Sequence, residues 1–182
     1  MAWQNALDRH YANPDNGGYF LTADDAEGLV VRPASTHDDA TPNPNAIAAT
    51  NLVRLAALSG DDAWREHADR LFDGVLSAAG DNLIGHAALL NALDLRLRGA
   101  EIVVTGSAPV AESLAAAALR LPTLTRIVLR ARNAGALPAS HPARDKIAAA
   151  SAGAAFVCVG ERCSLPVTTP AALAQAVAAM RA

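Results

Sequence analysis

Residues 37–45 concentrate side chains that can move protons or hold a polar ligand. The segment reads His37-Asp38-Asp39-Ala40-Thr41-Pro42-Asn43-Pro44-Asn45. Paired carboxylates suit acid/base work on sugars, and functional residues often lie on loops that a rigid scaffold holds. Asp and Asn are also the residues that turns and helix caps prefer. We take Asp38, Asp39 and Asn45 as candidate catalytic residues, with a purely structural loop as the alternative.

Four further residues are candidates for ligand binding. His37 and Asn43 belong to the same loop, and the aromatic residues Trp3 and Tyr19 precede it in the chain. Aromatic rings that flank a polar loop can line a cleft, although they pack into cores just as readily.

Cys158 and Cys163 are candidates for redox chemistry. Their C-x4-C spacing is neither the C-x2-C of thioredoxin-type motifs nor half of a four-cysteine zinc site, because the chain has two cysteines. Ordinary packed thiols are one interpretation. The other interpretation is a reversible disulfide: if residues 160–162 form a turn, the two Cβ atoms face each other at disulfide distance.

Specific signals for metals and nucleotides are absent from the sequence. His10, His67, His86 and His141 have no histidine partner four residues away, so a helical metal site is not indicated. The turn 105–109 follows an expected strand and could bind an anion at a helix start, but it lacks both glycine-rich nucleotide motifs and is better explained as a helix cap. We expect no metal and no cofactor.

Composition excludes several classes of protein. The chain has 182 residues, of which 52% are hydrophobic and 18% charged, with a net charge of −3. This is too apolar for a disordered chain and lacks the positive excess of a nucleic-acid binder. No apolar stretch of about 18 residues predicts a transmembrane helix, and the first residues lack the pattern of a signal peptide. With few cysteines, a cytoplasmic location without nucleic-acid or membrane partners is the expectation.

The elements that position these residues divide into two modules. Residues 1–99 carry a balance of −7 and residues 100–182 a balance of +4. The first module is predicted to be helical over residues 2–12, 45–58, 64–78 and 83–98 from its apolar spacing. The last of these helices should be buried on more than one side. Two β-rich runs at 18–22 and 28–32 predict a hairpin, and the prolines in 33–45 predict an irregular loop.

The second module, residues 100–182, is predicted to be a small three-layer α/β domain. Strands are expected at 101–106, 126–130 and 154–159. Helices are expected from Ser107 and Pro109 to Leu119, over 145–150, and from Thr169-Pro170 to Met180. The strand–helix–strand order predicts a parallel pair, and we expect a mainly parallel sheet.

Several segments, in this order, carry a resemblance to a known family. They are Gly17-Gly18-Tyr19-Phe20, residues 39–45 running into Asn51-Leu52-Val53-Arg54-Leu55, residues 101–106, His141-Pro142-Ala143, and residues 155–158 through 163–168. Together they resemble the C-terminal portion of the thioredoxin domain-containing family that includes spermatogenesis-associated protein 20. Asp39, Pro42 and Asn45 match that family's loop, whereas Asn43 and Pro44 stand where it commonly has Ser and Gly.

The resemblance implies an upstream thioredoxin-like domain and an (α/α)6 barrel similar to six-hairpin glycosidases. Residues 1–99 would then be the last helices of that barrel. One hypothesis is an enzyme of carbohydrate metabolism, with a carbohydrate-like ligand in the barrel mouth, Asp38 or Asp39 as acid or base and Asn45 orienting. The alternative is a non-catalytic binding or assembly module attached to the redox domain. In either case we expect this segment alone to be inactive, and uncovered helices in residues 46–98 to form a homo-oligomer.

Overall fold

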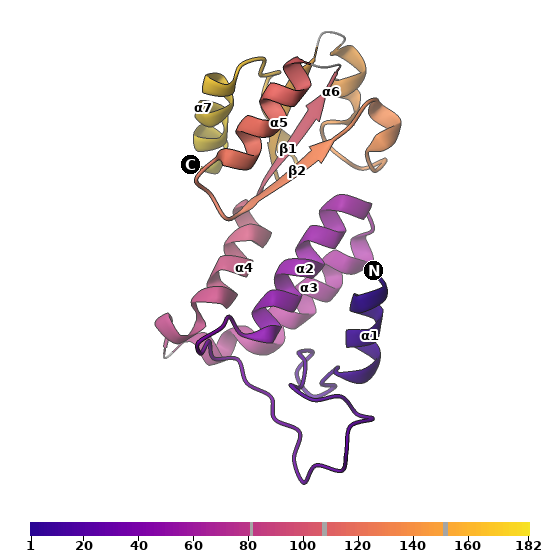
Figure 1. The fold of residues 1–182 in the computed structure, drawn as a ribbon, viewed down its shortest axis with the longest axis vertical. Coiled ribbons are helices and arrows are strands. Elements are labelled where there is room, and N and C mark those ends of the chain that lie inside the picture. The colour runs from indigo at the N-terminus through magenta and orange to yellow at the C-terminus, as the bar shows by residue number, and fades with distance from the viewer. Residues whose placement is uncertain (81, 107–108, 151–152) are drawn as a thin grey trace. The chain divides into compact units, whose positions relative to one another are not determined.

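The computed structural model describes residues 1–80, 82–106, 109–150 and 153–182. The fold is mixed: 51% of the chain is helical, and the described residues contain a small four-stranded mixed sheet (Figure 1). The chain divides into two compact units. Unit 1 comprises Met1–Ala56 with Asp62–Leu93, and unit 2 comprises Ala57–Asp61 with Asp94–Ala182. The division therefore falls a few residues before the expected boundary at residue 99.

The helices expected from apolar spacing in the first half of the chain are present, with shifted ends. They are α1 (Ala2–His10), α2 (Pro44–Ser59), α3 (Asp62–Val75) and α4 (Ala87–Arg98), with 3-10 turns η1 (Leu76–Ala79) and η2 (Ile84–His86). The stripe of Ala68, Leu71 and Val75 on α3 is buried. Among the described residues, no helix combines the length and apolar character needed to cross a membrane.

The helix expected over residues 83–98 is less buried than predicted. Its α-helical part begins at Ala87, and Leu89, Ala92 and Leu95 form one buried side. Ile84, in the preceding 3-10 turn, is 90% exposed, and Leu97 is also exposed. Apolar spacing around most of the helix therefore does not correspond to burial on more than one side in this chain.

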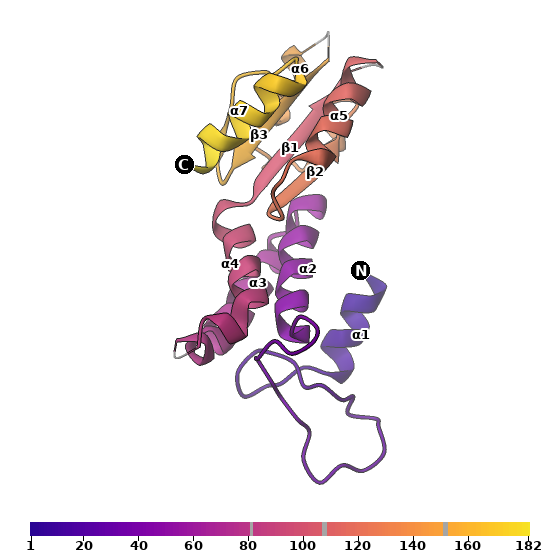
Figure 2. The ribbon, with the colours of Figure 1, turned by 60° about the vertical axis from the view of Figure 1, so that its left-hand side comes forward.

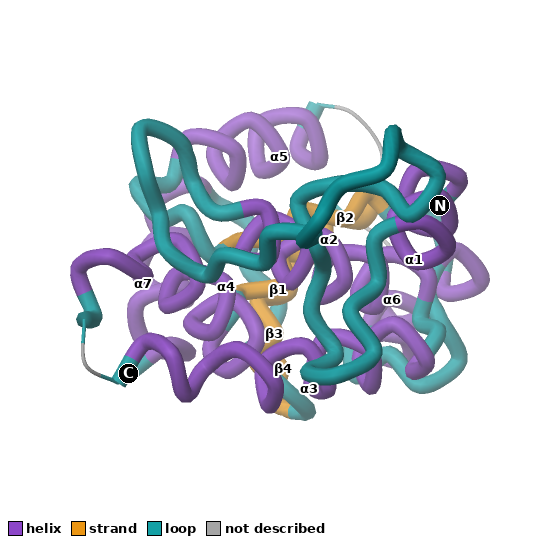
Figure 3. Tube along the Cα trace, turned by 90° about the horizontal axis from the view of Figure 1, so that it is seen from below, coloured by secondary structure: helices purple, strands orange, loops and turns teal. Residues whose placement is uncertain are grey.

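Residues 11–43 form a long loop between α1 and α2, drawn in teal in Figure 3. The hairpin predicted with arms 18–22 and 28–32 is wrong, because the described residues of this loop form only an isolated bridge between Ala12 and Tyr19. Val30 and Val31 project into solvent, so the alternating pattern of the second arm has no sheet to cover. The loop is instead held by Arg32, whose guanidinium donates to the carbonyls of His10 and Thr22.

A close backbone approach joins this loop to α3. A Cβ atom added to Gly74 would lie 1.4 Å from the carbonyl oxygen of Asn16, so the helix tolerates only glycine at this point. The loop backbone therefore lies directly on α3 and brings residues 16–19 to the buried side of the helix.

The sheet of unit 2 has the order β2-β1-β3-β4. Its strands are β1 (Ala100–Thr105), β2 (Arg126–Arg130), β3 (Ala154–Val159) and β4 (Arg162–Cys163). β1 and β2 are parallel, as the strand–helix–strand order predicted, but β3 runs antiparallel to β1 and β4 antiparallel to β3. The mainly parallel sheet is therefore a wrong prediction.

The direction of β3 follows from where its preceding segment lies. Thr105, at the end of β1, pairs with Ala154, at the start of β3, and Gly106 lies against Gly153. The chain thus stays at the carboxyl end of β1 and enters β3 from there, which requires an antiparallel return. β4, which was not predicted, follows a tight turn in which Gly160 adopts a left-handed φ of 58°.

Helices cover both faces of this sheet (Figure 2). α5 (Val110–Arg120) and α7 (Pro170–Arg181) pack on one face over Ile102, Val104 and Val157. α6 (Arg144–Ala149) and the segment 131–143 cover Phe156 and Cys158 on the other. The Thr169 side chain caps α7 as predicted, accepting a hydrogen bond from the Ala172 N–H. The predicted start of α5 at Ser107 lies outside the described residues.

Candidate functional site

The Asp38 carboxylate is engaged with backbone groups on both of its oxygens. Oδ1 accepts a hydrogen bond from the Asn43 N–H at 2.9 Å, and Oδ2 accepts one from the Ala88 N–H at 2.8 Å. Ala88 lies in the first turn of α4, so Asp38 caps a helix 50 residues away and meets the positive end of its dipole. This candidate catalytic group therefore ties the loop to α4.

Asn43 and Asn45 are buried and act on the backbone in the same way. The Asn43 amide donates to the carbonyls of Ser35 and His37. The Asn45 amide accepts from the Tyr19 N–H at 2.7 Å and donates to the Tyr19 and Ser35 carbonyls. The Asn45 group expected to orient a substrate thus holds the loop beside the start of α2.

Asp39 and His37 are the exposed candidates in the same loop. The Asp39 backbone N–H donates to the Thr41 carbonyl, and its side chain faces solvent. The His37 ring lies 4.2 Å from the ring of His86, which is fully buried. The Nδ1 atom of His86 lies 2.8 Å from the Asn82 carbonyl, so Nδ1 carries the proton and Nε2 accepts from the Thr36 hydroxyl.

Tyr19 is the centre of a hydrogen-bonded cluster in unit 1. Its phenol donates to Asp8 Oδ1 at 2.5 Å and accepts from the Gln4 amide at 2.9 Å. His67 Nε2 lies 3.2 Å from the same oxygen. Trp3, the other aromatic candidate, is 90% exposed on α1, so the structure does not bring it into this cluster.

The environment of the Tyr19 cluster changes two proton affinities. Burial, together with the hydrogen bond to Asp8, raises the pKa of Tyr19 well above its ordinary value. Burial lowers the pKa of His67 below its ordinary value, against the opposing charge of Asp8. The cluster therefore favours a neutral phenol and a neutral imidazole at neutral pH. The sequence did not identify Asp8 and His67 as members of this cluster. Its one local sign is the four-residue spacing of Gln4 and Asp8 on a helix, which does not point to Tyr19 or His67.

His10, Asp24 and Asp25 form a three-residue group in which each offers a metal-ligand atom, all within 4.8 Å of one another. The His10 Nδ1 atom lies 2.9 Å from Asp24 and 3.7 Å from Asp25, and both aspartates are exposed. The hydrogen bond from His10 lowers the pKa of Asp24. Arg32, which donates to the His10 carbonyl, brings a positive charge that disfavours a cation here.

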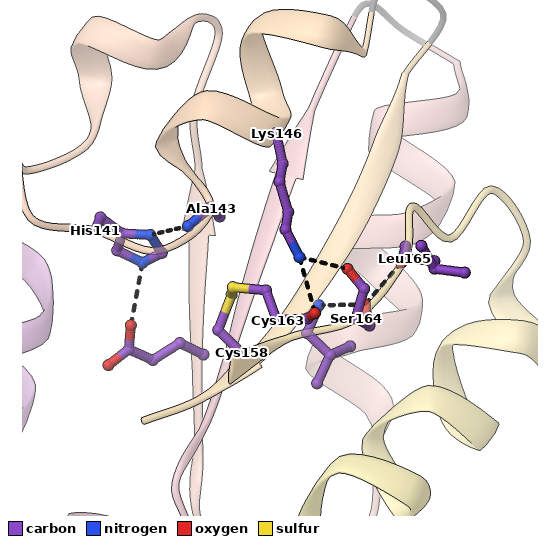
Figure 4. Close-up of a disulfide and its surroundings, with 9 residues drawn as sticks. His141, Ala143, Lys146, Cys158, Cys163, Ser164 and Leu165 are labelled. Atoms are coloured by element: carbon purple, nitrogen blue, oxygen red, sulfur yellow. Dashed lines mark hydrogen bonds and ion pairs between the residues drawn. A yellow bond between two sulfur atoms is a disulfide. The ribbon is translucent and has the colours of Figure 1, made fainter. Parts of the chain in front are cut away.

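In unit 2 the two cysteines form a disulfide (Figure 4). Cys158 on β3 faces Cys163 on β4 across the hairpin, with their Cα atoms 4.0 Å apart. The interpretation as separate thiols is therefore wrong, and the turn at residues 160–162 is the reason. The Lys146 ammonium donates to the carbonyls of Cys163 and Ser164 at 2.9 and 3.3 Å.

His141 and Glu101 are joined by a hydrogen bond on the same face of the sheet. His141 Nε2 lies 3.1 Å from the Glu101 carboxylate, while its Nδ1 accepts a hydrogen bond from the Ala143 N–H (Figure 4). The imidazole therefore presents its Nε2 proton to Glu101. Glu101 lies opposite Cys158 in the pairing of β1 with β3.

A cavity of about 1210 Å³ opens at the carboxyl ends of β1 and β2. Arg130, Arg132 and Asn133 line it from one side and Gly106 and Glu112 from the other. The turn at 105–109 interpreted from sequence as a helix cap borders this cavity, but residues 107 and 108 lie outside the described part of the chain. Glu112 reduces the positive charge that the two arginines would offer to an anion.

Comparison with known proteins gives one informative relative. No family model matches the chain. Uncharacterized protein B0495.5 of Caenorhabditis elegans is 28% identical over 156 residues, which cover 84% of this chain and 21% of that protein. The chain thus spans about a fifth of the length of this relative.

Proposed function

We propose that this chain is a non-catalytic assembly segment of a larger protein, resembling the C-terminal portion of the thioredoxin domain-containing family named above. The observation that supports this most is the use of the polar loop. Both oxygens of Asp38 and the amides of Asn43 and Asn45 bond to backbone groups, which leaves them little capacity to bind a substrate. These hydrogen bonds hold the loop in place, which is a structural role.

Exposed apolar side chains on unit 1 support the same proposal. Ile47, Leu83 and Ile84 are large and exposed within residues 46–98. In a helical barrel such residues would pack against neighbouring hairpins, and in this segment alone they favour association. The relative, about five times as long as the region it shares with this chain, is consistent with further helices elsewhere in the polypeptide. A cytoplasmic location remains part of the proposal.

Light scattering of the isolated chain at micromolar concentration tests the assembly proposal. We expect a dimer or larger species that becomes monomeric when Leu83 and Ile84 are both replaced by Lys. The matched control replaces Val30 and Val31 by Lys, since these are also exposed but lie outside residues 46–98. A monodisperse wild-type monomer, or equal effects of the two double substitutions, contradicts the proposal.

A carbohydrate-directed enzyme is the second candidate, and exposed Asp39 favours it. Unlike Asp38, its carboxylate faces solvent. In this case the complete protein would use Asp39 as acid or base on a sugar-like ligand. The substitution Asp39→Ala in the complete protein separates the candidates: unchanged turnover fits the assembly role, whereas loss of turnover with intact folding fits the enzyme.

A further inference from the structure

The two cysteines of the disulfide in unit 2 differ in exposure. Cys158 is 1% exposed in the apolar core between the sheet and α6, whereas Cys163 is half-buried on the edge strand β4. Exchange begins with in-line attack of a thiolate on one sulfur, so access decides which sulfur is attacked. An incoming thiolate can therefore reach Cys163, with Cys158 as the leaving group.

The hairpin that carries the disulfide is also held by hydrogen bonds that do not involve the sulfurs. The backbone N–H of Ser164 donates to the Val157 carbonyl at 2.8 Å, and the Val157 N–H donates to the Ser164 hydroxyl oxygen at 3.1 Å. The cysteines are only five residues apart, and closing so short a loop removes less entropy from the unfolded chain than closing a long loop would. A purely stabilising disulfide would therefore gain more from a longer separation.

Charged groups around the disulfide make its two ends different. Lys146 from α6 binds the Cys163 carbonyl, and Arg162 precedes Cys163 on β4. Glu161 lies in the turn, and Glu101 from β1 is in register with Cys158. Cations stabilise a thiolate and anions disfavour it. A cation therefore contacts the Cys163 residue, whereas an anion is in register with Cys158.

A mainly apolar cavity of about 440 Å³ lies beside Ser164, the residue that follows Cys163. Its lining includes Lys146 and Ser164, which also surround Cys163, together with Phe156, Leu165 and Pro166. Leu165 is 83% exposed at its edge. This cavity can hold apolar groups that flank a thiol, and its lining residue Lys146 is bonded to the Cys163 carbonyl.

We propose that Cys158–Cys163 is a thiol–disulfide exchange site whose substrate is a dithiol with apolar groups beside the attacking thiol. A substrate thiolate forms a bond to Cys163 Sγ, and the bond between the two cysteine sulfurs breaks to release the Cys158 thiolate, which takes up the proton lost by the substrate's second thiol. The second thiolate of the substrate then attacks the substrate sulfur that is bonded to Cys163. The mixed disulfide breaks, and Cys163 leaves as a thiolate that is protonated from solvent. The substrate is oxidised to a disulfide, and the protein gains two electrons and two protons. This proposal is independent of the assembly function.

Reduction of the wild-type chain by dithiothreitol in increasing, sub-denaturing urea is the first test. If the native disulfide is attacked directly, the reduction rate measured by mass spectrometry stays constant over this urea range. If reduction needs unfolding, the rate rises with urea in parallel with the unfolded population, and the proposal is overturned. This experiment needs no variant.

Two reciprocal variants test which sulfur reacts. In Cys158→Ser the remaining Cys163 should form a mixed disulfide with oxidised glutathione at least about tenfold faster than Cys158 does in Cys163→Ser. In the Cys158→Ser background, Lys146→Met should slow the reaction of Cys163 with oxidised glutathione about threefold near neutral pH. Lys146→Arg should leave that rate unchanged. Equal reactivity of the two cysteines, in variants with native circular dichroism, contradicts the proposal.

Discussion

In unit 1 the loop between α1 and α2 is held by side chains bonded to backbone, whereas in unit 2 the backbone is held mainly by other backbone in a sheet. Asp38, Asn43 and Asn45 provide many of the bonds in the first case. In unit 2 the paired strands bond to one another, and an apolar cluster packs on each face of the sheet. Polar residues that suggest catalysis in a sequence can therefore serve an irregular fold, while the disulfide lies in the more regular unit.

The comparison can be tested by measuring the unfolding of each unit separately. Trp3 and Trp64 are the two tryptophans of the chain and both belong to unit 1. Their fluorescence therefore follows unit 1, and hydrogen exchange of the sheet amides follows unit 2.

The largest effect should come from the core of unit 2. Phe156 is among the largest fully buried side chains and packs with Ile147 and Cys158. We expect Phe156→Ala to lower the free energy of unfolding of unit 2 by about 4 kcal/mol, because it leaves a cavity. Hydrogen exchange of the β1 and β3 amides measures this. Leu165→Ala, at an exposed position, is the control and should change it by less than about 0.5 kcal/mol. A small effect of Phe156→Ala would show that the sheet is not held by packing.

A smaller but still large effect should come from Asn45 in unit 1. The substitution Asn45→Ala leaves the Tyr19 N–H and the Tyr19 and Ser35 carbonyls without this partner. Buried groups left unpaired should cost about 3 kcal/mol in urea unfolding followed by tryptophan fluorescence. Asn51→Ala, at an exposed position on α2, is the matched control and should be nearly neutral. Equal stability of the two variants would mean that the Asn45 bonds are not needed to hold the loop.

Asp38 and Asp39 give a third comparison within one loop. Asp38→Ala removes the cap of α4 and should destabilise unit 1 by about 2 kcal/mol. Asp39→Ala should change stability by less than about 0.5 kcal/mol, because the side chain is exposed. The same fluorescence assay measures both. A larger loss for Asp39→Ala than for Asp38→Ala would reverse the structural assignment of the two carboxylates.

The smallest effect concerns pH. Burial lowers the pKa of His67 in the folded chain below its ordinary value of 6.5, so the unfolded chain takes up a proton first as pH falls. The stability contribution of neutral His67 is therefore present above pH 6.5 and is lost as pH falls below it. As pH is lowered below 6.5, the urea midpoint measured by fluorescence should decrease more steeply in the wild type than in His67→Gln. Identical slopes would place His67 outside the buried cluster.

Secondary structure followed from local pattern wherever apolar spacing coincided with burial. The stripe of Ala68, Leu71 and Val75 identified α3, and the Thr169-Pro170 pair identified the start of α7. The Val30-Val31 run has the same residue types as a strand but faces solvent, so its pattern predicted a hairpin that does not form. β-branched residues indicate a strand only when a sheet is there to receive them.

The direction of β3 and the Tyr19 cluster depend on distant parts of the chain. The strand itself was predicted, but its direction is set by Thr105 and Gly153 meeting at one end of the sheet, which no local pattern records. Tyr19 and His67 are 48 residues apart and meet because Gly74 lets the loop lie on α3. The spacing of Cys158 and Cys163 allowed both thiols and a disulfide, and the turn decided between them.

Lys146 is the one lysine of the sequence. Amine-directed reagents such as succinimidyl esters can therefore label a single side chain, apart from the chain's first amino group. Its contact with the Cys163 carbonyl places that label beside the β4 edge. A fluorophore or photo-crosslinker attached there would report on, or capture, whatever approaches the hairpin, without any engineered cysteine.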